Sequence, residues 1–319
     1  MTVRVALDLM GGDAAPDAVL DGALLVSDER PDIQVVLVGP EEVAAERLAA
    51  RGVPGRFETV HASESIGMAE DPARAVRAKR DATVRVAARL VRDGAADATV
   101  SAGSSGAALA AALFTLGRLP GVTRPAIAVV IPAPNGRVVL LDAGANPDAG
   151  PDLLAQFALT GTAYAAAIGV DAPRVGLLNI GHEPGKGDEL RRQAYDLIAA
   201  LPGVAFAGNV EAHDVALGGA ADVVVTDGFT GNVLLKGIEG ALRMHADPAV
   251  EPDEHGGAVL LGVNGVAVIG HGASTPRAVA SCVALAADAV AGQLVPRLTE
   301  TLTELVARRR AQAGLEVAR

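Results

Sequence analysis

The sequence predicts an α/β protein of three layers, in which helices cover both faces of a mostly parallel β-sheet. Short, uniformly apolar runs alternate with amphipathic segments, loops rich in Gly and Asp separate them, and aromatic residues make up only 2% of the chain. Strands that are apolar on both sides are typical of a parallel sheet buried between helices. No Ser- or Pro-rich linker divides the 319 residues, so we expect a single α/β domain over residues 1–319.

The expected elements follow one another as strand, polar loop and helix. The apolar runs that predict strands are residues 3–10, 34–38, 96–100, 138–142, 174–180, 204–206, 221–227 and 266–270. The amphipathic segments that predict helices are residues 17–25, 107–117, 152–159, 188–198, 233–240 and 276–290. Parallel strands need right-handed crossovers, and ligands of such sheets bind beyond the carboxyl ends of the strands. The loops there are therefore the expected functional regions.

The composition limits the class of partner. A formal net charge of -11 repels nucleic acid unless basic residues cluster, and scarce aromatic residues disfavour base stacking, so we expect no nucleic-acid partner. The single cysteine, Cys282, excludes an internal disulfide and a cysteine-based zinc site. The six histidines show no metal-ligand spacing, so no metal site is expected. The N-terminus lacks a signal-peptide pattern, which favours a cytoplasmic protein.

Several loops have residues suited to binding an oxyanion. Residues 101–106 (SAGSSG) and 227–232 (DGFTGN) combine glycines with a following helix, whose N-terminal N–H groups attract anions. Residues 181–187 (GHEPGKG) are not a Walker A motif, because three residues instead of four separate the first two glycines. Lys186 can still direct its charge at a phosphate or a developing oxyanion. No G-x-G-x-x-G dinucleotide motif occurs.

Arginines recur at helical spacing after Asp71 and Pro72, which are a good helix start. On one helix, an apolar face would lie opposite a basic stripe formed by Arg74, Arg77, Arg85, Arg89 and Arg92. Two interpretations stay open, a solvated helix face and a docking surface for an acidic partner.

Nine motifs cover nearly the whole chain in one order. They are ALDLMGGDAAPDAVLDGA, EDPARAVRAKRDATV, SAGSSGA, RPAIA, LDAGANPDAGPDLLAQFA, PRVGLLNIGHEPGKG, FAGNVEAHD, ADVVVTDGFTGNVLLKGIEG and GGAVLLGVNGVAVIGHGAS. Together they resemble the PlsX family, the acyl-carrier-protein:phosphate acyltransferases. The resemblance implies that inorganic phosphate attacks the thioester of a fatty acyl carrier protein, giving acyl phosphate for phospholipid synthesis. It also implies a homodimer, no organic cofactor, and a fold similar to isopropylmalate dehydrogenases and phosphotransacetylases.

The resemblance also assigns residues to a site. The catalytic residues it implies are Lys186, Asp227, Asn232 and His271. The residues it places around the phosphate and substrate are Asp8, Gly11, Gly12, Ser101, Gly103, Ser104, Gly144, Asn146 and Asn209. The acidic carrier protein would dock on Arg74, Arg77, Arg85 and Arg89.

The chain departs from the family pattern at two places. It has SAGSSGA where the family usually has SAGNTGA, and the long helical hairpin linked to membrane contact is shortened near residues 243–256. We therefore expect weaker membrane association, with the cytoplasmic protein at most peripheral at the inner membrane face. Three alternatives stay open: a phosphotransacetylase-like enzyme using acyl-CoA, an NAD- and metal-dependent decarboxylating dehydrogenase, and a non-catalytic binding module.

Overall fold

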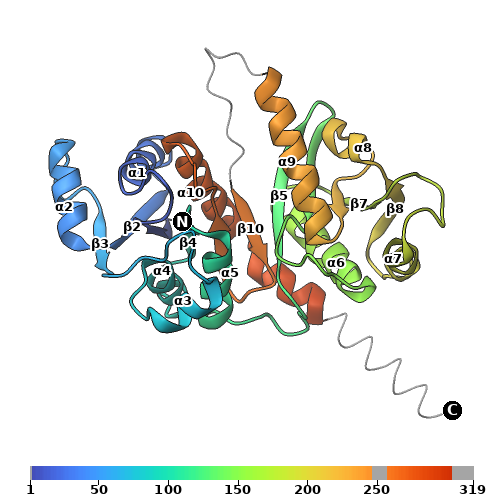
Figure 1. Cartoon of the computed structure of the whole chain (residues 1–319), viewed down its shortest axis with the longest axis horizontal. Helices are drawn as coiled ribbons and strands as arrows, with labels where there is room; N and C mark the ends of the chain where they lie inside the picture. The colour runs from blue at the N-terminus through green and yellow to red at the C-terminus, as the bar shows by residue number, and fades with distance from the viewer. Residues whose placement is uncertain (1, 246–256, 304–319) are drawn as a thin grey trace, which may run out of the picture. The chain divides into compact units, whose positions relative to one another are not determined.

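The structure is a computed structural model that describes residues 2–245 and 257–303 (Figure 1). The chain forms two compact units, the first from Met1–Gly117 with Ala246–Ala291 and the second from Arg118–His245 with Gly292–Arg319. Each unit is an α/β structure with its own core. The single domain expected over residues 1–319 stays a prediction, and residues 246–256 of the shortened hairpin region lie outside the described residues.

The first unit holds six described strands in the order β3-β2-β1-β4-β11-β10. Its strands are β1 (Val3–Asp8), β2 (Ile33–Gly39), β3 (Glu58–His61), β4 (Ala98–Ser101), β10 (Ala258–Leu261) and β11 (Val266–Ile269). Its helices are α1 (Asp17–Glu29), α2 (Glu41–Ala50), α3 (Pro72–Ala78), α4 (Thr83–Arg92), α5 (Ser105–Thr115) and α10 (Pro276–Ala291). Neighbouring strands are parallel except β10 and β11. Helix α1 packs on α10 and α4 packs on α5, so helices flank the sheet.

The second unit holds five described strands in the order β5-β6-β9-β7-β8. Its strands are β5 (Ala126–Ala133), β6 (Gly136–Leu141), β7 (Arg174–Leu178), β8 (Ala205–Val210) and β9 (Val223–Val225). Its helices are α6 (Pro151–Ala167), α7 (Glu189–Ala199), α8 (Ala212–Leu217) and α9 (Gly228–His245). Only the β5–β6 hairpin is antiparallel, so β6, β9, β7 and β8 all end at the same edge.

The mostly parallel α/β architecture is confirmed, and small residues provide the close packing expected of it. Gly22 on α1 faces Val279 on α10, where an added Cβ would lie 2.6 Å from the valine Cβ. Gly161 on α6 similarly leaves room for Val223 of β9. Strands β3, β5 and β10 were not expected from the sequence. The last two each precede a strand in an antiparallel hairpin, so no glycine-rich loop and helix follow them.

The prediction of one long basic helix is wrong, because α3 ends at Ala78 and α4 begins at Thr83. The intervening backbone bonds to another segment instead of continuing the helix. Thr83 N–H donates to the Glu64 carbonyl at 2.9 Å, and Glu64 N–H donates to the Asp81 carbonyl at 3.3 Å. The Asp81 carboxylate also accepts hydrogen bonds from the backbone and hydroxyl of Ser63, at 2.8 and 2.7 Å. These contacts replace the i→i−4 bonds that the helix needs.

Among the described residues, no single helix is both long and apolar enough to cross a membrane. One bent helix pair, Pro276–Ala291 with Leu294–Thr303, meets the length and composition requirements only when its two parts are counted together.

Two glycines of α9 give opposite predictions on alanine substitution. An added Cβ at Gly231 would lie 2.0 Å from the Asp142 carbonyl oxygen, whereas Gly237 has no neighbouring atom within 4 Å. We expect Gly231→Ala to lower the free energy of unfolding by at least about 1 kcal/mol through overpacking. Gly237→Ala should raise it by about 0.5–1 kcal/mol, because alanine favours the helix. Thermal unfolding of both variants checks this, and a Gly231→Ala protein as stable as the parent would contradict the close approach.

Candidate active site

Three loops of the first unit follow β1, β4 and β11, which lie side by side and parallel. The Ser101 hydroxyl donates to Asp8 Oδ2 at 2.7 Å and accepts a hydrogen bond from Gly103 N–H at 3.2 Å. Asp13 N–H donates to the Gly272 carbonyl at 2.7 Å, which joins the loop after β1 to the loop after β11. The structure therefore brings the predicted residues of these loops together at one sheet edge.

Two glycines make the approach of these loops possible. A Cβ at Gly11 would lie 2.9 Å from Asp8 Oδ2 and 3.0 Å from Ser101 Oγ, so this position has no room for a side chain. Gly12 has a φ of +113°, a left-handed conformation that other residues rarely adopt. This geometry lets the loop backbone approach the neighbouring loops closely, while the predicted contact of Gly11 and Gly12 with phosphate or substrate stays a prediction.

The Asp8 carboxyl group is buried, with 3% of the residue exposed. Burial raises the pKa of Asp8, although hydrogen bonds from Thr83, Ser101 and the Met10 N–H oppose the shift. An aspartate whose pKa is raised in this way can hold a proton at pH values where an exposed aspartate has lost it.

Ser104 and His271 occupy different surroundings. Ser104 is the N-cap of α5 and accepts a hydrogen bond from Ala107 N–H at 3.4 Å, which is a structural role. His271 is exposed, and its Nδ1 accepts a hydrogen bond from Ala273 N–H at 3.3 Å. A neutral His271 therefore carries its proton on Nε2, the nitrogen left for a ligand.

In the second unit, a buried carboxylate that was not predicted organises the loop after β6. Asp142 is 0% exposed and accepts hydrogen bonds from the N–H groups of Ile127, Gly144 and Ala145 at 3.0, 3.1 and 3.0 Å. Its other oxygen accepts from the backbone and side chain of Asn146, at 2.7 and 2.9 Å. The Asn146 amide therefore points into the protein, where it also donates to the Pro125 carbonyl at 2.8 Å. Its predicted contact with substrate would require another atom of the residue.

Asp227 forms a buried ion pair with Arg191. The Asp227 side chain is 7% exposed and the Arg191 side chain is 12% exposed. Its carboxylate also accepts hydrogen bonds from the Thr230 hydroxyl and N–H, at 2.8 and 2.9 Å. Burial raises the pKa of Asp227, but the Thr230 hydrogen bonds and the Arg191 charge outweigh it, so the pKa lies below its usual range. This carboxylate is held in its charged form. Nothing in the sequence singled out Arg191, which lies within helix α7.

The Arg191–Asp227 pair borders a pocket of about 610 Å³. The residues that line this pocket are Pro147, Asp148, Ala149, Gly150, Leu190, Arg191, Asp227, Phe229 and Thr230. Asn232 is exposed on the same helix as Phe229, and its Oδ1 lies 3.9 Å from a Cβ built on Gly144. The loops after β6 and β9 thus bring two predicted residues, Asn232 and Gly144, close together.

Lys186 extends from a loop held by two asparagines. Its side chain is 51% exposed, and its Nζ lies 3.9 Å from Glu183 Oε2. Asn179 Nδ2 donates to the Lys186 carbonyl at 3.1 Å and to Asn209 Oδ1 at 3.0 Å. Asn209 Nδ2 donates to the Glu183 carbonyl at 2.9 Å. Asn209 therefore fixes the loop, and the Lys186 ammonium group stays accessible.

The four arginines of α3 and α4 that were predicted to dock a carrier protein divide into two groups. Arg85 donates to the Val76 carbonyl at 2.7 Å and Arg89 to the Arg80 carbonyl at 3.0 Å, so both satisfy backbone acceptors. Arg74 and Arg77 are exposed, and the Arg77 guanidinium lies 4.7 Å above the Phe114 ring centroid. The exposed pair is better placed than Arg85 and Arg89 to contact a partner.

Glycine-rich loops, buried carboxylates and helix N-termini lie at the carboxyl ends of the parallel strands, an arrangement in which α/β enzymes commonly bind small oxyanionic groups. A family model described as "Fatty acid synthesis protein" matches residues 3–247. A phosphate acyltransferase from Desulfitobacterium hafniense (strain DSM 10664 / DCB-2) is 44% identical over 333 residues, which cover 96% of this chain and 99% of that protein. One from Magnetococcus marinus is 44% identical over 338 residues, covering 95% and 96%. The chain belongs to the phosphate acyltransferase family.

Solved structures support the fold. A phosphotransacetylase from Streptococcus pyogenes matches with a TM-score of 0.65 at 20% identity, covering 92% of this chain and 94% of that one. A branched-chain phosphotransacylase from Enterococcus faecalis V583 matches with a TM-score of 0.63 at 17% identity, covering 91% and 99%. A 4-hydroxythreonine-4-phosphate dehydrogenase from Klebsiella pneumoniae has a TM-score of 0.58 at 15% identity, covering 91% and 99%. The fold expected from the resemblance is confirmed.

The buried Arg191–Asp227 pair predicts acid sensitivity. Because the pKa of Asp227 is lowered by folding, its stabilisation is present above about pH 4 and is lost as the pH falls through the lowered pKa. Asp227→Asn removes one charge of the pair and should lower the free energy of unfolding at pH 7 by at least about 1 kcal/mol. The loss relative to the parent should shrink at low pH.

Urea unfolding at pH 7 and pH 3 measures both effects. The control is Asp148→Asn, an exposed carboxylate of the same pocket, which should change stability by less than about 0.5 kcal/mol. Equal stability of Asp227→Asn and the parent at pH 7 would show that the pair contributes nothing.

Proposed function

We propose that this protein transfers a fatty acyl group from acyl carrier protein to inorganic phosphate, a step of phospholipid synthesis. The observation that carries the proposal is the 44% identity to phosphate acyltransferases over nearly the full chain. The polar loops after β1, β4, β6 and β9 are consistent with it. They present backbone N–H groups, hydroxyls and charges of the kind that bind phosphate.

The chemistry requires no nucleophile from the protein. A phosphate oxygen attacks the thioester carbonyl carbon, so a C–O bond forms, the C–S bond breaks, and the carrier thiolate leaves and takes up a proton. The protein must then hold two reactants in line and stabilise the oxyanion of the tetrahedral intermediate. This agrees with the sequence, where Cys282 is buried in α10 and no serine nucleophile motif occurs.

We assign Lys186 to this electrostatic task. Its backbone is held by Asn179, while its ammonium group is exposed and only loosely paired with Glu183. A positioned positive charge stabilises negative charge as it develops on the carbonyl or phosphate oxygens. Asp227 takes the role of orienting Arg191 at the pocket that both residues line.

The acidic carrier protein would dock on the exposed guanidinium groups of Arg74 and Arg77. The chain has a net charge of -11, so a local basic surface is needed to attract a second acidic protein. A homodimer in the cytoplasm, with weak peripheral contact to the inner membrane face, completes the proposal on the basis of family resemblance.

Acyl phosphate trapping tests the function. Enzyme, phosphate and acyl carrier protein thioester are mixed, and hydroxylamine converts acyl phosphate to a hydroxamate that is measured. We expect product that depends on phosphate, and a lower rate with the coenzyme A ester of the same acyl chain. Equal or faster reaction of the coenzyme A ester would favour a phosphotransacetylase-like enzyme instead.

Charge reversal at Arg74 and Arg77 tests the docking surface in the same assay. The double variant should raise KM for the carrier thioester roughly tenfold, because charges at the edge of an interface mainly affect encounter. Its kcat should change little. Arg56→Glu, an exposed arginine outside α3 and α4, is the control.

Lys186→Ala should lower turnover at least roughly tenfold, the lower end of losses for a positioned charge. Lys236→Ala is a matched control, since Lys236 is also exposed and also pairs with a glutamate three residues away. It should keep turnover within about twofold. Near-normal turnover of Lys186→Ala would remove Lys186 from the mechanism.

A further inference from the structure

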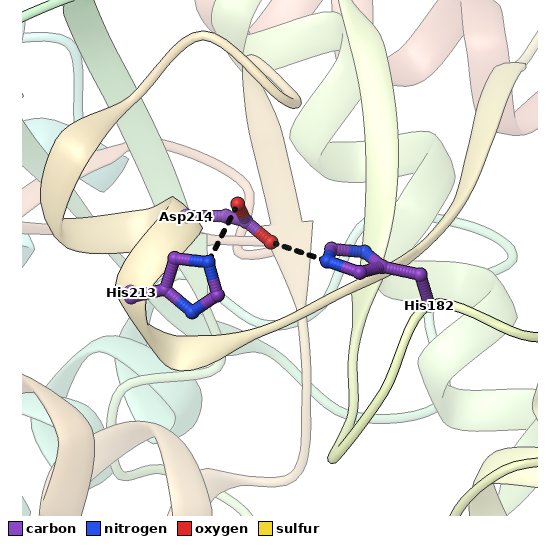
Figure 2. A group of neighbouring side chains, drawn as sticks. All are labelled: His182, His213 and Asp214. Carbon is purple, nitrogen blue, oxygen red and sulfur yellow. Dashed lines mark ion pairs between the residues drawn. The ribbon is translucent and has the colours of Figure 1, made fainter.

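Two histidines and an aspartate from separate segments meet on the second unit (Figure 2). The parallel register of β7 and β8 places Leu178 beside Val210, so the loops that follow these strands begin side by side. His182 belongs to the first loop, whereas His213 and Asp214 begin helix α8.

The Asp214 carboxylate lies between the two imidazole rings, as Figure 2 shows. Its Oδ2 is 3.7 Å from His182 Nε2, and its Oδ1 is 3.4 Å from His213 Nε2. One donor atom from each of the three residues lies within 4.8 Å of the other two. Bonds of about 2.0–2.1 Å place neighbouring ligands of a tetrahedral zinc ion roughly 3.4 Å apart. The two histidine–aspartate separations, each to a different oxygen of Asp214, are close to or slightly longer than that value.

The hydrogen bonds of the rings leave the correct nitrogens for a metal ion. His182 Nδ1 lies 3.3 Å from the Asn209 carbonyl oxygen. A carbonyl can only accept, so Nδ1 carries a proton; in the neutral tautomer that this leaves, the lone pair of Nε2 faces Asp214. His213 Nδ1 lies 3.5 Å from a carboxylate oxygen of Glu211, which can hold its proton in the same way. Ligand histidines in metalloproteins are typically oriented by a carbonyl or carboxylate behind the ring.

The carboxylates are also fixed in place. Asp214 accepts a hydrogen bond from Glu211 N–H at 2.8 Å, within the capping box of α8. Glu211 Oε1 lies 3.9 Å from His182 Nε2, so a second carboxylate borders the group while its side chain caps α8. The side chains of His182 and His213 are 57% and 60% exposed, so the rings can close on an ion and water can complete its coordination.

We propose that His182, His213 and Asp214 form a binding site for a divalent transition-metal ion of the zinc class. Two imidazoles with one carboxylate are a donor set that suits Zn²⁺ and its neighbours better than Mg²⁺ or Ca²⁺. The positive ion offsets the charges of Asp214 and Glu211. The bound ion would connect the loop that carries Lys186 to helix α8 and so hold these two segments together.

Zinc binding to the chelator-treated full chain tests the site directly. Isothermal titration with Zn²⁺ should show one ion bound per chain. His182→Ala and His213→Ala should each weaken binding at least about tenfold, a loss that even second-shell partners of metals can cause. His61→Ala, an exposed histidine of the first unit, should bind as the parent does.

Cobalt supplies a second readout that does not depend on activity. Co²⁺ bound by nitrogen and oxygen in a four- or five-coordinate site absorbs visible light more strongly than aqueous Co²⁺, and this signal should disappear in both histidine variants. Circular dichroism confirms that the variants are folded. The proposal is overturned if no stoichiometric binding occurs, or if both variants bind Zn²⁺ like the parent. In either case, the residues form only ion pairs between protonated histidines and carboxylates.

Discussion

The second unit depends on a buried carboxylate that has no exposure to solvent. Asp142 accepts five hydrogen bonds and so fixes three things at once: the start of β5 at Ile127, the turn through Gly144, and the amide of Asn146. Charged acceptors form stronger hydrogen bonds than neutral ones, and leaving several N–H donors unpaired in the core would be costly. Helix α9 then approaches this loop so closely that Gly228 and Gly231 have no room for a Cβ.

A buried carboxylate also orders a loop of the first unit, through fewer hydrogen bonds. Asp8, Ser101 and Gly103 form a hydrogen-bonded chain across two adjacent strand ends, and Gly11 lies against it. In both units a buried acid, at the end of a strand or directly after it, orders the backbone of the loop that follows. Loops held in this way keep their N–H groups in fixed positions, which would lower the cost of binding the phosphate of the proposed reaction.

The sequence predicted the elements whose signals are local. Strands β1, β2, β4, β6, β7, β8, β9 and β11 were expected at about their observed positions, whereas the short edge strand β3 was not. Strands β5 and β10 were missed because hairpin strands have no such loop and helix after them. The break between α3 and α4 was missed because it arises from pairing with residues 63–65, which helical periodicity does not record.

In the candidate site, too, the residues that were missed have partners that are distant in sequence. Asp142 directly follows strand β6, within the motif LDAGANPDAGPDLLAQFA. An acid at that position could have been predicted to order the loop that follows. No local sequence signal identifies Arg191, because its partner Asp227 is distant in sequence. Only the pairing of β7 with β9 brings the two residues together. His182 and His213 show no metal-ligand spacing in the sequence for the same reason. Their separation along the chain concealed the parallel register that places their loops side by side.

Under the proposed function, the arginines of α3 and α4 affect how long a docked carrier protein stays bound. Arg85 and Arg89 are occupied by the carbonyls of Val76 and Arg80, so they cannot swing freely to meet an arriving surface. Under the proposed function, a carrier protein that docks here is held mainly by the exposed charges of Arg74 and Arg77. Exposed charges of this kind mainly raise the association rate and add little to the lifetime of the complex. A short-lived complex suits the proposed carrier, which must leave after delivering each acyl group.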